Sequence, residues 1–229
     1  MTKATSDINH RLEQYRELQR SIPCLGNIYS LMRTENKNVA GSDARVLIVG
    51  AGGGREIEEF AASGFLPKLV AIDPSQPNLD ISQHLAARHG ITARVEFFQG
   101  TLIELPDQGP FNAVTSLLVM HHLQDDGSKL EFLREIRRRL APNGVVIHAD
   151  IAFDESDNIS LLKNTYRAYA KALSIDDTLT TLELDSVTSL PTATPLRTCE
   201  LFEQAGLAKP QEVFRSLWYR CWISRVRAA

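Results

Sequence analysis

The sequence predicts a doubly wound α/β sandwich, in which helices cover both faces of a mostly parallel β-sheet. Two observations support this fold class. Short apolar runs typical of buried strands alternate along the chain with longer segments of helical periodicity. The first apolar run, residues 45–49, also ends in a glycine cluster at residues 50–54, and a helical pattern begins directly after it. Such a glycine turn is typical of the point where a strand of a parallel sheet passes into a helix.

The elements before and within the sheet follow in order along the chain. Apolar side chains at positions 8, 12, 15 and 18 predict a helix over residues 7–20, which Pro23 ends. Residues 26–32 predict a second short helix, and the polar, glycine-containing residues 36–43 predict a loop. Buried strands are predicted at residues 45–49, 68–72, 94–98, 111–118 and 144–151, with helices near 54–63, 76–89 and 127–140 between them.

The last third of the chain differs in composition from the segment before it. Residues 156–173 predict a long helix, whereas the Thr- and Asp-rich residues 176–194 are typical of a loop. A further helix over residues 195–205 begins at Pro195 and stops before Gly206, which is the usual placement of these two residue types. The apolar runs 212–217 and 219–226 lie close enough in sequence to predict an antiparallel pair.

Composition excludes several classes of protein. A chain of 229 residues with 43% hydrophobic content can bury a full core as one domain. A net charge of −3 creates no field that would attract nucleic acid or an anionic membrane. The three cysteines are scattered and odd in number, which favours a reducing, cytoplasmic compartment. The polar amino terminus does not resemble a signal peptide, no apolar run approaches the ~20 residues that span a bilayer, and no Cys/His spacing predicts a metal site.

The glycine cluster and Asp73 together predict a nucleoside-binding pocket. Asp73 ends the apolar run 68–72, where its carboxylate can accept hydrogen bonds from two ribose hydroxyls. The first turn of the following helix offers free N–H groups. A dinucleotide fingerprint would need a third glycine at position 55, where this chain has Arg55. The observed glycine spacing, at 50, 52 and 54, is instead typical of S-adenosylmethionine enzymes and disfavours a dehydrogenase.

Two later segments make a resemblance specific. Residues 111–123, which end in Met-His-His-Leu, and residues 140–144, Leu-Ala-Pro-Asn-Gly, resemble the fourth- and fifth-strand motifs of class I S-adenosylmethionine-dependent methyltransferases. The resemblance implies a Rossmann-like methyltransferase sandwich with a seven-stranded sheet and an antiparallel last strand. It also implies S-adenosylmethionine as cofactor and S-adenosylhomocysteine as product. The single domain 1–229 would then comprise a helical cap at 1–40, a cofactor-binding core at 45–151, a lid-like insertion at 156–194, and a last helix and hairpin at 195–226.

The same resemblance assigns the cofactor contacts. The glycine loop would pass beneath the methionine part, Asp73 would hold the ribose, the 101–102 segment would border the adenine, and the end of the fourth strand would line the wall nearest the sulfonium. The residues assigned in this way are Gly50, Ala51, Gly52, Gly54, Asp73, Pro74, Thr101, Leu102, Leu117 and Met120. Ile48 and Thr101 stand where many members carry an acid, so we expect weaker anchoring of the cofactor rather than its loss.

The outer segments resemble a more specialised branch. Residues 20–28, 201–207 and 218–222 are similar to the ends of carboxy-S-adenosylmethionine synthases, which act in tRNA wobble-uridine modification. This similarity implies a helical cap over the cofactor and a homodimer. A carboxylated cofactor needs a basic partner, yet residues 172–193 contain no Arg or Lys and carry four acids, Asp176, Asp177, Glu183 and Asp185. An unpaired carboxylate beside acids is strongly disfavoured, so the sequence favours ordinary methyl transfer.

The candidate catalytic residues are His121, His122 and Asp150. The two histidines follow the fourth predicted strand and Asp150 ends the fifth, and adjacent parallel strands bring their carboxyl ends to one crevice. One histidine is therefore predicted to act as general base while Asp150 orients it. The alternative, that the histidines start a helix or pack in the core, stays open.

The predicted acceptor is a small molecule. The basic run at residues 134–139 shares its helix with Glu131 and Glu135, which favours a solvated face with paired charges over a nucleic-acid surface. Aromatic side chains at 166, 169, 218, 219 and 222 form either an acceptor wall or sheet core. Two other functions remain, a carboxy-S-adenosylmethionine synthase-like enzyme and a protein that binds S-adenosylmethionine without catalysis.

Overall fold

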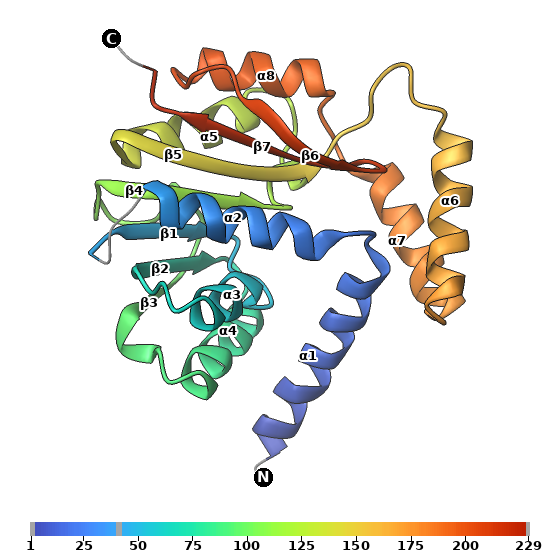
Figure 1. Cartoon of the computed structure of the whole chain (residues 1–229), viewed down its shortest axis with the longest axis horizontal. Helices are drawn as coiled ribbons and strands as arrows, with labels where there is room; N and C mark the ends of the chain where they lie inside the picture. Colours follow the sequence, from blue (N-terminus) through green and yellow to red (C-terminus); the bar gives the residue numbers. More distant parts are fainter. Residues whose placement is uncertain (1–2, 40–42, 228–229) are drawn as a thin grey trace.

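Seven strands form one sheet in the computed structural model, which describes residues 3–39 and 43–227 (Figure 1). The strands are Arg45–Val49 (β1), Lys68–Asp73 (β2), Val95–Gln99 (β3), Phe111–Leu117 (β4), Leu140–Ile151 (β5), Gln211–Ser216 (β6) and Tyr219–Arg225 (β7). Their order across the sheet is β3-β2-β1-β4-β5-β7-β6. Strands β1 to β5 pair in parallel, and β7 runs antiparallel to both β5 and β6. The predicted fold class is confirmed, including the antiparallel last strand.

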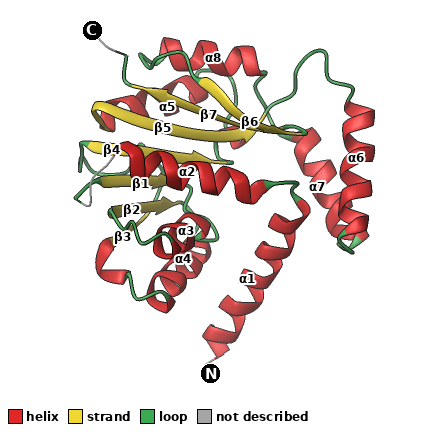
Figure 2. Cartoon of the chain, viewed as in Figure 1, coloured by secondary structure: helices red, strands yellow, loops and turns green. Residues whose placement is uncertain are grey.

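Helices cover both faces of this sheet (Figure 2). The helices are Lys3–Ser21 (α1), Leu25–Val39 (α2), Arg55–Ala62 (α3), Gln76–Arg88 (α4), Ser128–Arg139 (α5), Ile159–Ala172 (α6), Asp177–Ser189 (α7) and Pro195–Gln204 (α8), with short 3₁₀ turns at Thr92–Arg94 (η1) and Met120–His122 (η2). On β1, Val46 and Ile48 belong to the core that includes α2 and α3, while Leu47 and Val49 belong to the core that includes α5 and α8. Because successive side chains of a strand point to opposite faces, a strand buried on both faces reads as a continuous apolar run.

The strand order reverses between β1 and β4. The chain passes from β1 outward through β2 and β3 and then returns to pair β4 with the other edge of β1. Register places Val49, the last residue of β1, beside Ser116 near the end of β4. The glycine loop and the segment after β4 therefore leave the sheet side by side, and such a switch point is where ligands bind in open α/β sheets.

Helices α1, α2, α6 and α7 lie around the carboxyl ends of the strands (Figure 1). The corner between α1 and α2 approaches α7, and α6 lies beside α7 (Figure 1). The prediction of a loop at 176–194 is wrong, because most of this segment is helix α7. Asp176 caps it by accepting hydrogen bonds from the N–H groups of Thr178 and Leu179, and a buried stripe of Thr180, Leu184 and Val187 holds it to the core. The polar composition concealed this stripe.

Helix α2 is longer than predicted. It runs to Val39, so the first residues of the predicted loop at 36–43 are helical, and Asn36 is buried with its side-chain amide donating to the carbonyl of Met32. Residues 40–42 of that loop, and the ends 1–2 and 228–229, lie outside the described residues. None of the helices in the described chain has both the length and the apolarity that crossing a bilayer requires.

Candidate active site

A cavity of about 500 Å³ opens at the carboxyl ends of β1, β2 and β4. We call it the glycine-loop cavity, and it is lined by Tyr15, Tyr29, Val49, Gly50, Gly52, Ile72, Asp73, Pro74, Ser75, Asn78, Gly100, Thr101, Leu102, Leu117, Leu118, Val119, His122, Leu123 and Phe132. Apolar walls with a few convergent polar groups are typical of a cofactor or small-molecule site.

The glycine loop lacks side chains where the neighbouring chain leaves no room for them. Gly50 has a φ of 75°, and a Cβ there would lie 2.5 Å from Cγ2 of Val119. Gly54 has a φ of 70°, and a Cβ there would meet Cδ1 of Leu85 at 2.9 Å. Both positions need glycine for the backbone conformation and for space. The loop thus leaves its backbone open to a ligand.

Asp73 holds the loop and also faces the cavity. One carboxylate oxygen, Oδ2, accepts a hydrogen bond from Gly52 N at 2.9 Å. The other, Oδ1, accepts from Ser75 N at 2.8 Å and from the Asn78 amide at 3.3 Å. Each carboxylate oxygen has a second lone pair. Asp73 can therefore accept further hydrogen bonds from a diol without losing those that position it.

The predicted cofactor contacts divide into two groups. Gly50, Gly52, Asp73, Pro74, Thr101, Leu102 and Leu117 line the glycine-loop cavity. Ala51, Gly54 and Met120 do not, because Ala51 and Met120 are buried and Gly54 packs against α4. Ile48 is also fully buried, so the position where relatives carry an acid is core here. Sequence reasoning missed the contributions of Tyr15, Tyr29 and Asn78, which come from separate helices.

A buried arginine braces the outer wall of this cavity. Arg139 donates to the carbonyls of Leu102 and Pro106, each at 3.0 Å, and to the carbonyl of Leu105. The basic run thus includes one side chain that holds the 101–106 segment. The side chains of Arg134 and Arg138 instead pair with Glu131 and Glu135 on the exposed face of α5, as the sequence predicts.

Asp150 and His121 form a buried pair at the ends of β5 and β4. His121 Nδ1 is hydrogen-bonded to Asp150 Oδ1, which also accepts from the backbone N–H of Ile151 at 3.0 Å. Burial alone would raise the pKa of Asp150, but the hydrogen bond and charge of His121 bring that pKa below its usual value. An ionised carboxylate only accepts hydrogen bonds, so Asp150 keeps a proton on Nδ1 of His121, and in the neutral ring Nε2 is then the proton acceptor.

His122 lies beside this pair but does not bond to Asp150. Its ring centroid is 4.3 Å from that of His121. Burial, and then the nearby His121, lower the pKa of His122 and favour the neutral ring. Lys129 holds the η2 turn that carries both histidines, because its Nζ donates to the carbonyl of Met120 at 2.7 Å. The structure therefore distinguishes the two histidines, which the sequence left equivalent.

A second, smaller cavity of about 190 Å³ adjoins the first. We call it the histidine chamber, and it is lined by Tyr15, Gln19, Ile22, Leu25, Leu118, His121, His122, Ile151, Glu183, Ser186, Val187, Leu190 and Tyr219. It shares Tyr15, Leu118 and His122 with the glycine-loop cavity. Leu118 has a φ of 61°, a strained conformation for leucine, and its N–H donates to Ala149 O at 2.7 Å. The two cavities thus meet at the end of β4.

The core of the chain matches a known family. Residues 46–144 match a family model described as "Methyltransferase domain". The match contains the glycine loop, Asp73 and both histidines, and Asp150 lies just beyond it. Residues 46–144 form a class I S-adenosylmethionine-dependent methyltransferase domain. Seven strands in the order found here, with the last antiparallel, agree with that family's fold.

The relatives of this methyltransferase domain include enzymes named for oxygen and nitrogen acceptors. The chain is 33% identical over 107 residues to the ubiquinone biosynthesis O-methyltransferase of Caulobacter sp. (strain K31), which covers 47% of this chain and 40% of that relative. It is 34% identical over 94 residues to the ajmaline N-methyltransferase of Rauvolfia serpentina, covering 38% of this chain and 31% of the relative. The chain thus spans less than half the length of these curated relatives.

Solved structures extend the likeness in fold to nearly the whole chain. The 1,6-didemethyltoxoflavin-N1-methyltransferase of Burkholderia thailandensis, solved with bound 1,6-didemethyltoxoflavin and S-adenosylhomocysteine, has a TM-score of 0.65 and 20% identity. That comparison covers 97% of this chain and 87% of the other. The fold of the methyltransferase domain therefore continues into the helices and hairpin that follow it.

The residues of the methyltransferase domain fit its cofactor. The glycine loop has no Cβ in the cavity at Gly50 or Gly52, Asp73 can accept from a ribose diol, and Leu102 and Leu117 offer apolar contact. Thr101 gives its N–H and its hydroxyl proton to Oε2 of Glu104, each at 2.8 Å. The Thr101 oxygen then acts toward a ligand as an acceptor.

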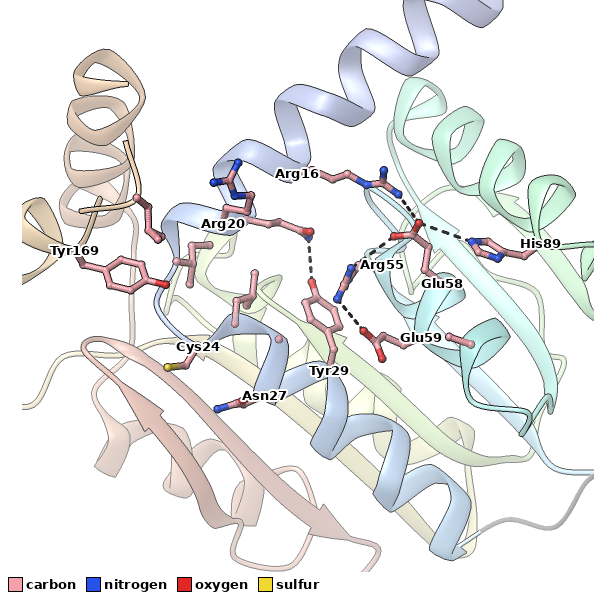
Figure 3. Close-up of a pocket in the computed structure, with 16 residues that line it drawn as sticks. Arg16, Arg20, Cys24, Asn27, Tyr29, Arg55, Glu58, Glu59, His89 and Tyr169 are labelled. Carbon is pink, nitrogen blue, oxygen red and sulfur yellow. Dashed lines mark hydrogen bonds and ion pairs between the residues drawn. The ribbon is translucent and has the colours of Figure 1, made fainter. Parts of the chain in front are cut away.

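A larger groove beside the glycine-loop cavity contains charged pairs among uncharged lining residues (Figure 3). It has a volume of about 760 Å³ and is lined by residues of α1, α2, α3 and α6. Arg16 pairs with Glu58 at 2.6 Å, and Arg55 pairs with Glu59 at 2.8 Å. Arg55 lines this groove and not the glycine-loop cavity, so its guanidinium is committed to the acids of its own helix.

The five aromatic residues of the last third have different surroundings. Trp218 and Trp222 are buried in the core, where Trp222 stacks on His148 and Trp218 packs against Tyr166. Tyr169 lines the groove of Figure 3. Only Tyr219, among these five, borders the histidine chamber. The choice between an acceptor wall and sheet core, which the sequence left open, therefore differs from one of these residues to the next.

Proposed function

We propose that this protein methylates a small organic molecule bound in the histidine chamber, with His121 as general base. The observation that carries the proposal is the buried His121–Asp150 pair, which opens onto a chamber that meets the glycine-loop cavity at Leu118 and His122. S-Adenosylmethionine, when bound, supplies an electrophilic methyl group. The chain has to hold the acceptor, exclude water and take up a proton.

Each of these tasks has candidate residues. Asp73 and the glycine loop hold the cofactor, and Thr101 with Leu102 borders its adenine. Ile22, Leu25 and Leu190 close the chamber with apolar surface from the cap and from the segment after α7. His121 Nε2 takes the acceptor's proton while Asp150 keeps the ring in the required tautomer. In this proposal residues 156–194 act as a lid over the acceptor.

The size of the chamber supports a small acceptor. Its volume of about 190 Å³ is below the range of roughly 300–1,000 Å³ typical of pockets for drug-sized ligands. The printed names of the relatives include both an O-methyltransferase and an N-methyltransferase. A hydroxyl or amine acceptor, each of which releases a proton on methylation, agrees with a histidine base.

Two other functions have less support. A carboxy-S-adenosylmethionine synthase needs a cation near the transferred group, but the described residues that line the histidine chamber include Glu183 and neither Lys nor Arg. A purely cofactor-binding protein has no need of a buried His–Asp pair at a cavity. A cytoplasmic location and a homodimer remain proposals from composition and resemblance, and light scattering after size-exclusion chromatography tests the dimer.

The test is methyl transfer to a library of small hydroxyl and amine compounds, followed by mass spectrometry of S-adenosylhomocysteine. We expect acceptor-dependent product, and we expect His121→Gln and Asp150→Asn each to lower kcat by about 10²–10⁴-fold. Their affinity for S-adenosylhomocysteine, measured by calorimetry, should stay unchanged. His10→Gln, at an exposed position on α1, is the control. Binding without turnover across the library would instead favour the non-catalytic function.

A further inference from the structure

One acidic side chain of the histidine chamber has no role in the proposed chemistry. Glu183 lies on α7 beside the buried stripe that includes Leu184 and Val187, so the helix turns it toward the chamber. The hydroxyl of Tyr219 donates a hydrogen bond to Glu183 Oε1. Within residues 3–39 and 43–227, no group donates a hydrogen bond to Oε2. One oxygen of this carboxylate is therefore available to a ligand.

The sheet holds the partner of Glu183 in place. Tyr219 begins β7 and pairs with Ile151, which ends β5. Because β7 runs antiparallel to β5, its first residue lies at the edge where the parallel strands end. Tyr219 is 1% exposed. A fully packed tyrosine on the sheet thus holds the carboxylate of Glu183 on α7 in place.

No Lys or Arg among the described residues that line the chamber pairs with the charge of Glu183. The other titratable residues that face it are His121, His122, Tyr15 and Tyr219. His121 favours the ionised form of Glu183 but is itself hydrogen-bonded to Asp150, and burial keeps His122 toward its neutral form. Burial also raises the pKa of Glu183. A carboxylate among apolar walls is costly unless a donor or a cation pairs with it.

We infer that the histidine chamber selects a small organic base, whose ammonium or protonated ring nitrogen pairs with Glu183 while a second group meets His121 and His122. The inference rests on the proposed function and names its substrate class. The same carboxylate repels an acceptor that carries a carboxylate or a phosphate. With about 190 Å³ available, the base is a compound of about one ring. Glu183 thus serves as a binding and selectivity residue and takes no proton from the acceptor.

The test compares three probes of nearly equal shape that differ in charge: tyramine, 4-ethylphenol and 3-(4-hydroxyphenyl)propanoate. Binding of each to the full chain saturated with S-adenosylhomocysteine is measured by calorimetry at pH 7.5. We expect tyramine to bind at least about tenfold more tightly than 4-ethylphenol, and the propanoate to bind most weakly. Glu183→Gln should abolish the preference for tyramine and leave S-adenosylhomocysteine binding unchanged.

Two further variants control this result. Asp185→Asn changes an exposed acid on the same helix and should leave the ranking of the probes unchanged. Tyr219→Phe removes the donor to Oε1 but keeps the charge, so the preference for tyramine should persist. Equal binding of the three probes, tighter binding of the propanoate, or an unchanged ranking in Glu183→Gln overturns the inference.

The outcome is separable from that of the proposed function. If the ranking holds but no acceptor is ever methylated, the chamber binds bases and the proposed methyl transfer is wrong. If acceptors are methylated but only neutral or anionic ones, the proposed function stands and the assignment of Glu183 fails.

Discussion

The ring of Tyr15 on α1 occupies the space that a side chain at Gly53 would need. A Cβ at Gly53 would lie 2.2 Å from both Cδ1 and Cε1 of Tyr15. Tyr15 also lines both the glycine-loop cavity and the histidine chamber. The position of the Tyr15 ring beside the two cavities therefore depends on the absence of a side chain at Gly53.

We predict that Gly53→Ala displaces Tyr15 and weakens the binding of S-adenosylhomocysteine. Overpacking of this kind typically costs about 1–3 kcal/mol, and the loss is expected as lower affinity by calorimetry and a lower melting temperature. In the double variant with Tyr15→Ala the two effects should be less than additive, because the clash no longer exists. Gly26→Ala is the control, since a Cβ there meets nothing within 4 Å. Full additivity would contradict the contact.

Asp73→Asn should weaken cofactor binding more than it changes the fold. Hydrogen bonds to a charged group contribute about 1.5–3 kcal/mol, so we expect about a 10–100-fold loss of S-adenosylhomocysteine affinity. The reason is that an amide is neutral and has one acceptor oxygen in place of two, so it offers a ribose diol fewer lone pairs beside those that the loop N–H groups use. Asp107→Asn, at an exposed acid, should bind normally. An Asp73→Asn protein with unchanged affinity would show that the ribose is held elsewhere.

Glu56 should make the protein less stable as the pH rises. Burial is the main cause that raises its pKa from 4.5 to about 8, and it is 4% exposed. The folded state holds this proton more tightly than the unfolded chain, so its contribution is complete below pH 4.5 and is lost as the pH rises through about 8. The shift corresponds to about 5 kcal/mol. Urea unfolding from pH 5 to 9 should show a flatter profile for Glu56→Gln, and parallel profiles would contradict the prediction.

His148 should act in the opposite direction at lower pH. It is fully buried on β5, stacked on Trp222, and burial lowers its pKa from 6.5 to about 4. The unfolded chain binds the proton more readily between these values, so stability falls as the pH drops from 6.5 to 4, by about 3 kcal/mol. His148→Leu should remove this loss, as judged by chemical unfolding at pH 4.5 and 7. A wild-type-like acid loss in this variant would assign the effect to other groups.

The sequence predicted the sheet well because both of its signals are local. Strands buried on both faces appear as apolar runs, as at residues 45–49, and glycine at 50 reports a turn whatever surrounds it. Helix α7 was missed because its Thr- and Asp-rich composition is typical of loops, while three spaced residues decide its packing. Arg139 belongs to the basic run that the sequence assigned to a solvated helix face, yet it is buried against the carbonyls of Leu102 and Pro106.

The sequence by itself determined the fold class and the turn at the glycine loop. It also identified Asp73 and the three catalytic candidates as site residues, because each of these signals depends on neighbours in the chain. Only the tertiary structure decided that His121, and not His122, bonds to Asp150, since that choice depends on how η2 turns above β5. It also decided that Glu183 on α7 and Tyr219 on β7 share one chamber. These residues are distant in sequence and are brought together only when α7 packs against the end of the sheet.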